Sequence, residues 1–198
     1  VYTAKDANET LGVLRVMHPE VAKNQQMRAD FILEDYVCST LNHEALVQVL
    51  ASGSDASGAP YLVREVLQGE PVRAWLEKSG GYLPVPQALS VVEQVLRVLD
   101  LAHRNQIHHG NISPSNLYRT REGMIKVMNF GGRPKGGAFM APEQVGGETG
   151  NTGAKTDVWQ TGALLFNLLT GRSPYRGDRD PASSTRGVPG IRALSDVL

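Results

Sequence analysis

The chain has 198 residues, of which 20 are basic and 20 are acidic, so its formal net charge is zero and a strongly basic nucleic-acid binder is excluded. Its 41% hydrophobic content is typical of a soluble globular protein with one sizeable core or two small lobes. A single cysteine excludes an internal disulfide framework, and no apolar run reaches the roughly 18 residues of a membrane span, so we expect a cytoplasmic protein whose segment here makes no membrane contact.

The first half of the chain predicts strands around one helix. Residues 1–7 alternate and then turn, and short runs rich in Val and Leu indicate strands at residues 11–17, 45–53 and 60–67. Residues 27–41 have the periodicity of an amphipathic helix. Its apolar positions are Phe31, Val37, Cys38 and Leu41.

The second half is predicted to be mainly helical. Residues 85–104 form an amphipathic helix that Pro86 helps to begin. The face expected to be buried holds Ala88, Val92, Val95, Leu96, Leu99 and Ala102. Residues 154–170 are apolar almost all round, which predicts a buried helix that Gly171 ends. The two halves meet near residues 67–72.

Several segments, in this order, resemble those of the protein kinase family, and of the bacterial serine/threonine kinases in particular. They read HPEV, LNHEALVQVL, PYLVREVLQGE, HGNISPSN, NFG, FMAPEQV and DVWQTGALLFNLLTGRSPY. A series of spaced motifs is far more specific than one motif alone. The resemblance covers nearly the whole chain.

The resemblance implies an α+β, two-lobed protein kinase-like fold. We expect a small antiparallel sheet and one helix in an N-lobe at residues 1–67, and a mainly helical C-lobe at residues 68–198. The first strand and the Gly-rich loop of the family are expected to be missing before residue 1, and the last helices after residue 198. The fold is therefore predicted to be truncated at both ends.

The same comparison identifies four positions where the family's catalytic residues are replaced. Arg15 takes the place of the lysine that binds the nucleotide phosphates, and the planar arginine fork is not equivalent to an ammonium group. Asn111 takes the place of the general base, Ser113 that of a phosphate-steadying lysine, and Asn129 that of the magnesium-binding aspartate. No catalytic residue is therefore assigned. A bound cofactor is not expected.

Four further matching residues, two retained and two altered, bear on nucleotide binding. Glu34 and Asn116 keep the family's residue types, so residual nucleotide contacts are expected from Arg15, Glu34 and Asn116. Arg64 stands at the gatekeeper position, where a partly buried guanidinium needs an anionic partner, and we predict that it reaches Glu34. Tyr118 stands on the floor of the adenine site. Both Arg64 and Tyr118 are predicted to fill the pocket, which leaves ATP binding weak or absent.

Other matched positions are interpreted as structural. They are Cys38, His109, Phe130, Glu143 and Asp157, with His109 stacked under Phe130 and Asp157 anchoring the backbone of the catalytic loop. The histidines at positions 103, 108 and 109 have no nearby carboxylate or thiolate ligands, so no metal site is predicted. Only residues 132–140 separate the NFG and APE motifs. They contain no Ser, Thr or Tyr, so no phosphorylation switch is expected there.

These replacements lead to the interpretation of a pseudokinase, a kinase fold that is not an enzyme. The expected role is a protein-interaction, scaffold or regulatory module in bacterial signalling or cell-envelope assembly, with protein partners of unknown identity. The alternative is a regulatory switch that binds ATP without magnesium. A third hypothesis, altered transfer chemistry, requires a carboxylate that replaces Asn129.

Overall fold

The computed structural model describes residues 2–5, 11–131, 137–145 and 152–175. Its N-terminal part contains a four-stranded antiparallel sheet in the order β1-β2-β4-β3. The strands are β1 (Tyr2–Lys5), β2 (Leu11–Val16), β3 (Val49–Ser54) and β4 (Pro60–Glu65). The turn between β3 and β4 is closed by the exposed carboxylate of Asp55. It accepts hydrogen bonds from the hydroxyl of Ser57 and from the backbone N–H groups of Ala59 and Ser57, and these bonds, the one from the hydroxyl first, lower the pKa of Asp55.

Two helices precede β3 where the sequence predicted one. The additional helix is α1 (Pro19–Ala22), which Pro19 begins and the Nδ1 atom of His18 caps. The predicted helix is α2 (Gln25–Leu41), and it starts two residues earlier than expected. The side chain of Asn24 explains this start, because its Oδ1 accepts the N–H of Met27 at 3.0 Å as an N-terminal cap does.

The predicted apolar face of α2 is largely confirmed. Phe31, Val37 and Leu41 are buried, whereas Ile32 and Tyr36 are exposed. The side chain of Cys38 lies outside the described part of the structure, so its assignment to the core stays a prediction.

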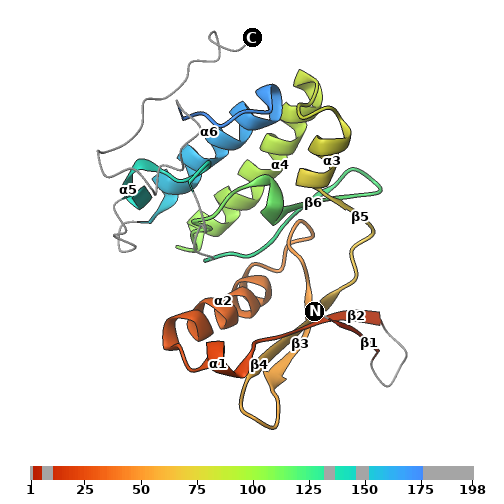
Figure 1. Ribbon diagram of the computed structural model, residues 1–198, viewed down its shortest axis with the longest axis vertical. Helices are drawn as coiled ribbons and strands as arrows, with labels where there is room; N and C mark the ends of the chain where they lie inside the picture. The colour runs from red at the N-terminus through yellow and green to blue at the C-terminus, as the bar shows by residue number, and fades with distance from the viewer. Residues whose placement is uncertain (1, 6–10, 132–136, 146–151, 176–198) are drawn as a thin grey trace.

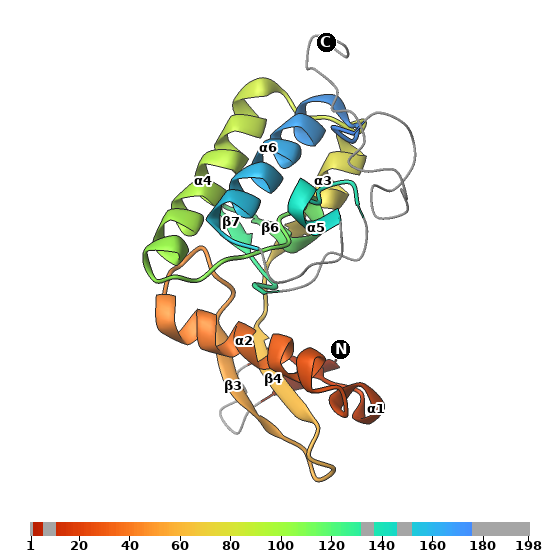
Figure 2. The ribbon, with the colours of Figure 1, turned by 90° about the vertical axis from the view of Figure 1, so that its left-hand side faces the viewer.

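The C-terminal part is built from helices and a second, three-stranded sheet (Figures 1 and 2). The helices are α3 (Val72–Lys78), α4 (Val85–Arg104), η1 (Pro114–Asn116), α5 (Pro142–Val145) and α6 (Ala154–Thr170). The strands are β5 (Gly69–Pro71), β6 (Leu117–Thr120) and β7 (Ile125–Val127). Helix α4 packs along α6, and the three-stranded sheet lies beside them.

Two details of the predicted helices are wrong. Leu96 is 44% exposed, and the buried stripe of α4 includes Val91 and Val98 instead. Val91 and Val98 belong to the same core cluster as Ile125 and Val127 of β7 and Leu164 of α6, and both of these elements contact α4. Helix α6 is not buried all round, since Val158 is 60% exposed. Its predicted end is confirmed by Gly171, which has the left-handed φ of 69° typical of a C-terminal cap.

One continuous core connects the two parts. It extends from Val37 and Leu41 of α2, through Phe130, to Leu164 and Leu168 of α6. The predicted α+β fold, with an antiparallel sheet in the N-terminal part and a largely helical C-terminal part, is thus confirmed, with α1 as an addition. The boundary between residues 67 and 68 falls between β4 and β5 and stays a prediction. Within the described residues, no helix combines the length and the apolar character that crossing a bilayer requires.

Candidate functional site

Two arginines of the four-stranded sheet meet one glutamate of α2. Val13 of β2 lies opposite Arg64 of β4, and Arg15 is two residues further along β2. Residues two apart on a strand share a face, so Arg15 and Arg64 lie diagonally on the same face. The Nη1 atom of Arg15 is 3.0 Å from Oε2 of Glu34, and Arg64 pairs with the same oxygen. The predicted contact between Arg64 and Glu34 is therefore confirmed.

This cluster carries one positive charge in excess, because two guanidinium groups share one carboxylate. The side chains of Glu34 and Arg64 are only 7% and 12% exposed, whereas that of Arg15 is 39% exposed. The ion pair with Arg64 compensates the desolvation of Glu34. Arg15 is thus the member of the cluster that solvent or a ligand reaches most easily.

Asn129 connects this cluster to the C-terminal part. Its backbone has a φ of 62°, a left-handed conformation that asparagine tolerates. Its Oδ1 accepts a long hydrogen bond of 3.4 Å from Arg15, and its backbone N–H donates to Glu34 at 3.4 Å. Its Nδ2 donates to Oδ1 of Asn116 at 2.9 Å, and Nδ2 of Asn116 donates to the carbonyl of Asn111 at 2.7 Å.

A side chain at Gly131 would strain the backbone of the turn around Asn129 and displace the side chain of Leu33. A Cβ atom there would lie 2.1 Å from Cδ2 of Leu33 on α2, and the φ of Gly131 is 68°. The glycine therefore allows α2 to approach the turn closely enough for Glu34 to contact Asn129.

The loop at residues 107–116 is held from its other side by Asp157 of α6. Oδ2 of Asp157 accepts the backbone N–H of His109 at 2.9 Å, and Oδ1 accepts that of Gly110 at 2.7 Å. Nε2 of His103 lies 2.7 Å from Oδ2, so the expectation that no carboxylate lies near the histidines at positions 103, 108 and 109 is wrong. The hydrogen bonds expected of Asp157 are thus present in the structure.

Two glutamines complete this anchor, and sequence reasoning missed both. Gln160 accepts the N–H of Ile112 at 2.7 Å and donates to the carbonyl of Gly110 at 3.0 Å. Gln144 of α5 donates to the same carbonyl at 2.8 Å. The available signal was the spacing on α6, since Gln160 follows Asp157 by three residues and so lies on the same face of an otherwise apolar helix.

His109 is completely buried in this anchor. Its ring centroid lies 4.5 Å from that of Phe130, which confirms the predicted stacking, and its Nε2 is 2.9 Å from the carbonyl of Met128. Burial lowers the pKa of His109 to about 4, although the negative charge of Asp157 opposes this shift. His109 is therefore neutral at physiological pH.

The remaining site residues occupy separate places. The hydroxyl of Tyr118 donates to the carbonyl of Leu67 at 3.2 Å, in the segment that follows β4. Ser113 is extended and makes no capping bond to η1. Oε1 of Glu143 accepts the hydroxyl of Thr156 at 2.6 Å, which joins α5 to α6. The pocket-filling role of Tyr118 and the structural role of Glu143 stay predictions. Residues 132–136, in the segment after Gly131, lie outside the described residues.

A second ion pair near the site was not expected from the sequence. Nζ of Lys126 on β7 lies 2.6 Å from Oε1 of Glu65 at the end of β4, and 3.2 Å from the carbonyl of Leu46. This buried lysine connects the last residue of β4 to the C-terminal sheet. A single lysine between the apolar Ile125 and Val127 was the available signal.

Apart from the carboxylate of Glu34, which both arginines engage, the side chains of this network end in amides and guanidinium groups. Amides at positions 111, 116 and 129 cannot take up a proton at neutral pH, and they are weaker magnesium ligands than carboxylates. Beside the excess charge of the arginine cluster, this donor set does not fit a magnesium ion, but it suits an anion. Among the described residues, no group of three or more His, Cys, Asp or Glu side chains could hold a metal ion.

Comparisons with known proteins agree with the fold. The model of the protein kinase domain family matches residues 1–195. A probable serine/threonine-protein kinase of Streptomyces coelicolor is 32% identical over 95% of this chain and 30% of its own length. The serine/threonine-protein kinase PknL of Mycobacterium tuberculosis is 33% identical over 83% of this chain and 44% of its own length. A crystal structure of the PknI kinase domain of Mycobacterium tuberculosis has a TM-score of 0.78 at 22% identity, covering 99% of this chain and 75% of that one.

These findings contradict the prediction that the chain is not an enzyme. The matched relatives are named as serine/threonine-protein kinases, although the chain spans less than half of their length. The prediction was wrong because it gave too much weight to the general base. Positioning and electrostatics dominate phosphoryl transfer, whereas general-base catalysis contributes a factor of about 10²–10⁴ to the rate. Replacing the base therefore argues for a lower rate, and it was too weak a ground for excluding the reaction.

Proposed function

Because the chain belongs to the protein kinase domain family, we propose that it is a nucleotide-binding signalling domain of the bacterial serine/threonine kinase type, which holds the phosphates of ATP without requiring magnesium. The observation that carries this proposal is the network from Arg15 through Glu34 and Asn129 to Asn116. We place its action in the cytoplasm, where ATP is available.

Arg15 is the phosphate-binding group of this proposal. Its guanidinium is 39% exposed, and a phosphate that it binds gains charge-assisted hydrogen bonds. Arg64 also pairs with Glu34, so the Glu34 carboxylate does not fully neutralise the charge of Arg15. The excess positive charge of the cluster neutralises part of the negative charge of the phosphates, as a metal ion does in other phosphate sites.

Nucleotide binding at Arg15 also acts on the connection between the two parts of the fold. Arg15 donates to Asn129, whose amide bonds Asn116 of the C-terminal part. A phosphate that draws Arg15 away weakens the 3.4 Å contact with Asn129. The domain can therefore couple nucleotide binding to the approach of α2 and the loop at residues 107–116, as a regulatory switch does.

We propose that phosphoryl transfer to a serine or threonine hydroxyl is slow in this domain. The hydroxyl proton has no carboxylate acceptor at position 111, which lowers the rate by about 10²–10⁴ relative to a site with an aspartate. Orientation of the acceptor and charge neutralisation by Arg15 remain as contributions to the rate.

Calorimetric titration with ATP tests nucleotide binding, once with a chelator and once with magnesium. We expect similar affinities under both conditions, and a loss of about tenfold for Arg15→Ala because a charge-assisted contact is removed. Arg97→Ala is the matched control, since Arg97 is exposed and pairs with Glu93 on α4. It lies outside the proposed nucleotide cleft, which is the side of the fold that holds Arg15, Glu34, Asn116 and Asn129. Binding that requires magnesium, or no binding at millimolar ATP, would refute the proposal.

Transfer of labelled phosphate to a serine- and threonine-containing protein mixture tests the slow reaction. The double variant Asn111→Asp, Asn129→Asp restores both carboxylates and is expected to raise the rate by about 10² or more. A double variant that folds and binds ATP but transfers no faster than the unmodified chain would contradict this explanation of the rate.

A protein-interaction role is a second candidate, favoured by the outer side of α2. Ile32 and Tyr36 lie one turn apart there and are 46% and 57% exposed. Exposed apolar side chains on a helix face are typical of contact surfaces. If Ile32→Glu and Tyr36→Glu leave the association of the domain with its signalling partners unchanged in a pull-down, this candidate is excluded.

A further inference from the structure

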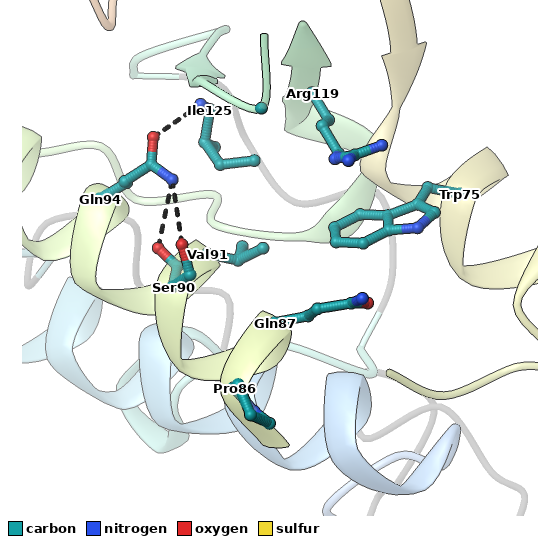
Figure 3. A pocket seen from close by; sticks show the side chains of 9 residues that line it. Trp75, Pro86, Gln87, Ser90, Val91, Gln94, Arg119 and Ile125 are labelled. Carbon is teal, nitrogen blue, oxygen red and sulfur yellow. Dashed lines mark hydrogen bonds between the residues drawn. The ribbon is translucent and has the colours of Figure 1, made fainter. Parts of the chain in front are cut away.

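A cavity of about 300 Å³ opens on the C-terminal part, between α3, the first half of α4 and the hairpin of β6 and β7 (Figure 3). This volume is at the lower end of the range found for ligand pockets. None of the residues that line it belongs to the arginine, glutamate and asparagine network of the cleft. Its chemistry therefore needs an explanation of its own.

The charged group of this pocket is Arg119, the only charged residue among the nine that line it. The guanidinium carbon of Arg119 lies 4.4 Å from the ring centroid of Trp75 on α3, so the cation rests on the face of the indole. Within the described residues, no carboxylate forms an ion pair with Arg119. The aromatic ring thus holds the guanidinium in place while its charge remains available to an anion.

The wall opposite Arg119 is held by α4. Gln94 accepts the N–H of Ile125 at 2.9 Å and donates to the carbonyl and the hydroxyl oxygen of Ser90 at 3.3 and 3.4 Å. Because the hydroxyl oxygen of Ser90 accepts in this arrangement, its proton can be donated to a ligand. Gln94 is therefore a fixed element of the wall, and Ser90 a donor on it.

Gln87 adds an amide at the mouth of the pocket. Its side chain extends from α4 toward Trp75 (Figure 3), and in the described part of the chain it makes no hydrogen bond. Val91 and Ile125, which are buried, form the apolar floor. The pocket thus combines one cation, two polar groups that can donate and an apolar surface.

We propose that this pocket is a docking site for an acidic peptide segment of a partner protein. A carboxylate of the peptide pairs with Arg119, and a neighbouring apolar side chain packs on Val91 and Trp75. Charge complementarity selects an acid, since no lining side chain is negative. The amide of Gln87 and the hydroxyl of Ser90 are placed to donate to the peptide backbone. This site acts independently of nucleotide in the cleft.

The test uses a blocked hexapeptide in which glutamate and leucine alternate, with a glutamine-for-glutamate peptide as the control ligand. Binding is followed by NMR on the indole N–H signals of the two tryptophans of the chain. We expect the signal of Trp75 to shift and that of Trp159 to stay, because Nε1 of Trp159 donates to the carbonyl of Met140 away from the pocket. The glutamine peptide is expected to bind about tenfold more weakly.

Arg119→Gln should lower the affinity for the acidic peptide about tenfold, because the charge-assisted contact is lost. Arg121→Gln is the matched control, since Arg121 is exposed on the same hairpin and does not line the pocket. Gln87→Ala, at an exposed position of α4, is a second variant with little risk to folding and should weaken binding about two- to threefold.

The proposal would be overturned by any of three results. The first is an equal affinity for the glutamate and glutamine peptides. The second is an equal loss of peptide affinity in Arg119→Gln and Arg121→Gln. The third is a peptide titration that leaves the indole N–H signal of Trp75 unchanged. Titration with free benzoate separates a peptide site from a small-molecule site. If benzoate binds as tightly as the peptide and blocks it, the pocket is a small-molecule site and the peptide proposal fails.

Discussion

The loop at residues 107–116 has a rear side and a cleft side, and the two are held by different chemistry. On the rear side, the buried carboxylate of Asp157 accepts two backbone N–H groups, and Gln160 bonds two more backbone groups. On the cleft side, the amide of Asn129 donates to that of Asn116, and the amide of Asn116 donates to the backbone carbonyl of Asn111. A carboxylate thus holds the backbone on the rear side, whereas amides make the contacts on the cleft side.

This difference teaches that the shape of the loop and its chemistry depend on separate residues. Hydrogen bonds from the rear side fix the backbone of His109 and Gly110 whatever side chain stands at position 111. The cleft residues can therefore change without unfolding the domain. Substitutions on the two sides should have effects of different kinds: on stability at the rear, and on ligand binding in the cleft.

The largest effect is expected from Asp157→Ala on the rear side. This change leaves the buried N–H groups of His109 and Gly110 without an acceptor, which costs about 1–3 kcal/mol for each group. It also removes the contact with His103. We therefore expect the free energy of unfolding to fall by about 3–5 kcal/mol. Urea denaturation measures it.

Asp100→Ala is the matched control on the surface. Asp100 pairs with Arg104 on the exposed side of α4, and the loss of such a pair changes stability by about 0.5 kcal/mol or less. Similar losses of unfolding free energy in Asp157→Ala and Asp100→Ala would show that Asp157 does not anchor the loop at residues 107–116.

The next effect concerns pH and His109. Its pKa in the folded state is about 4, below the ordinary value of 6.5, so the unfolded chain binds a proton more readily between these two values. The stability that burial of the neutral His109 ring contributes is fully present above pH 6.5, and it is lost as the pH falls toward 4. We expect a slope of roughly 1.4 kcal/mol per pH unit in this window, measured by urea denaturation at several pH values. A free energy of unfolding that stays constant from pH 6.5 to 4.5 would contradict the buried, neutral state of His109.

The smallest effect is expected from Asn129→Asp on the cleft side. The new carboxylate gives magnesium a ligand beside Asn116, so ATP should bind about tenfold more tightly with magnesium than without it. The free energy of unfolding should change by less than about 1 kcal/mol, since aspartate also tolerates a φ of 62°. Calorimetry with and without magnesium measures the first quantity. An unfolded variant, or one whose ATP affinity ignores magnesium, would break the comparison between the two sides.

The sequence allowed the elements and much of the site to be predicted where the signal was local or charged. Helix α6 ends at Gly171, and a buried guanidinium at position 64 required a partner, which Glu34 supplies. The prediction failed where a neighbour decided the outcome. Leu96 has the spacing of the buried face, yet it is exposed, whereas Val91 is buried on α4, which packs against both α6 and β7. The exclusion of enzyme activity failed because it counted missing groups without weighing what each contributes to the rate.

By itself, the sequence determined which side chains stand at the chemical positions, since an asparagine at positions 111 and 129 cannot carry a charge in any fold. It also determined the three long helices α2, α4 and α6, because their apolar spacing is a local property of the chain. Only the tertiary structure decided that Arg15 and Arg64 share one oxygen of Glu34, and that Arg119 rests on Trp75 beside an open pocket. These contacts join residues far apart in the chain, so they depend on strand register and helix packing.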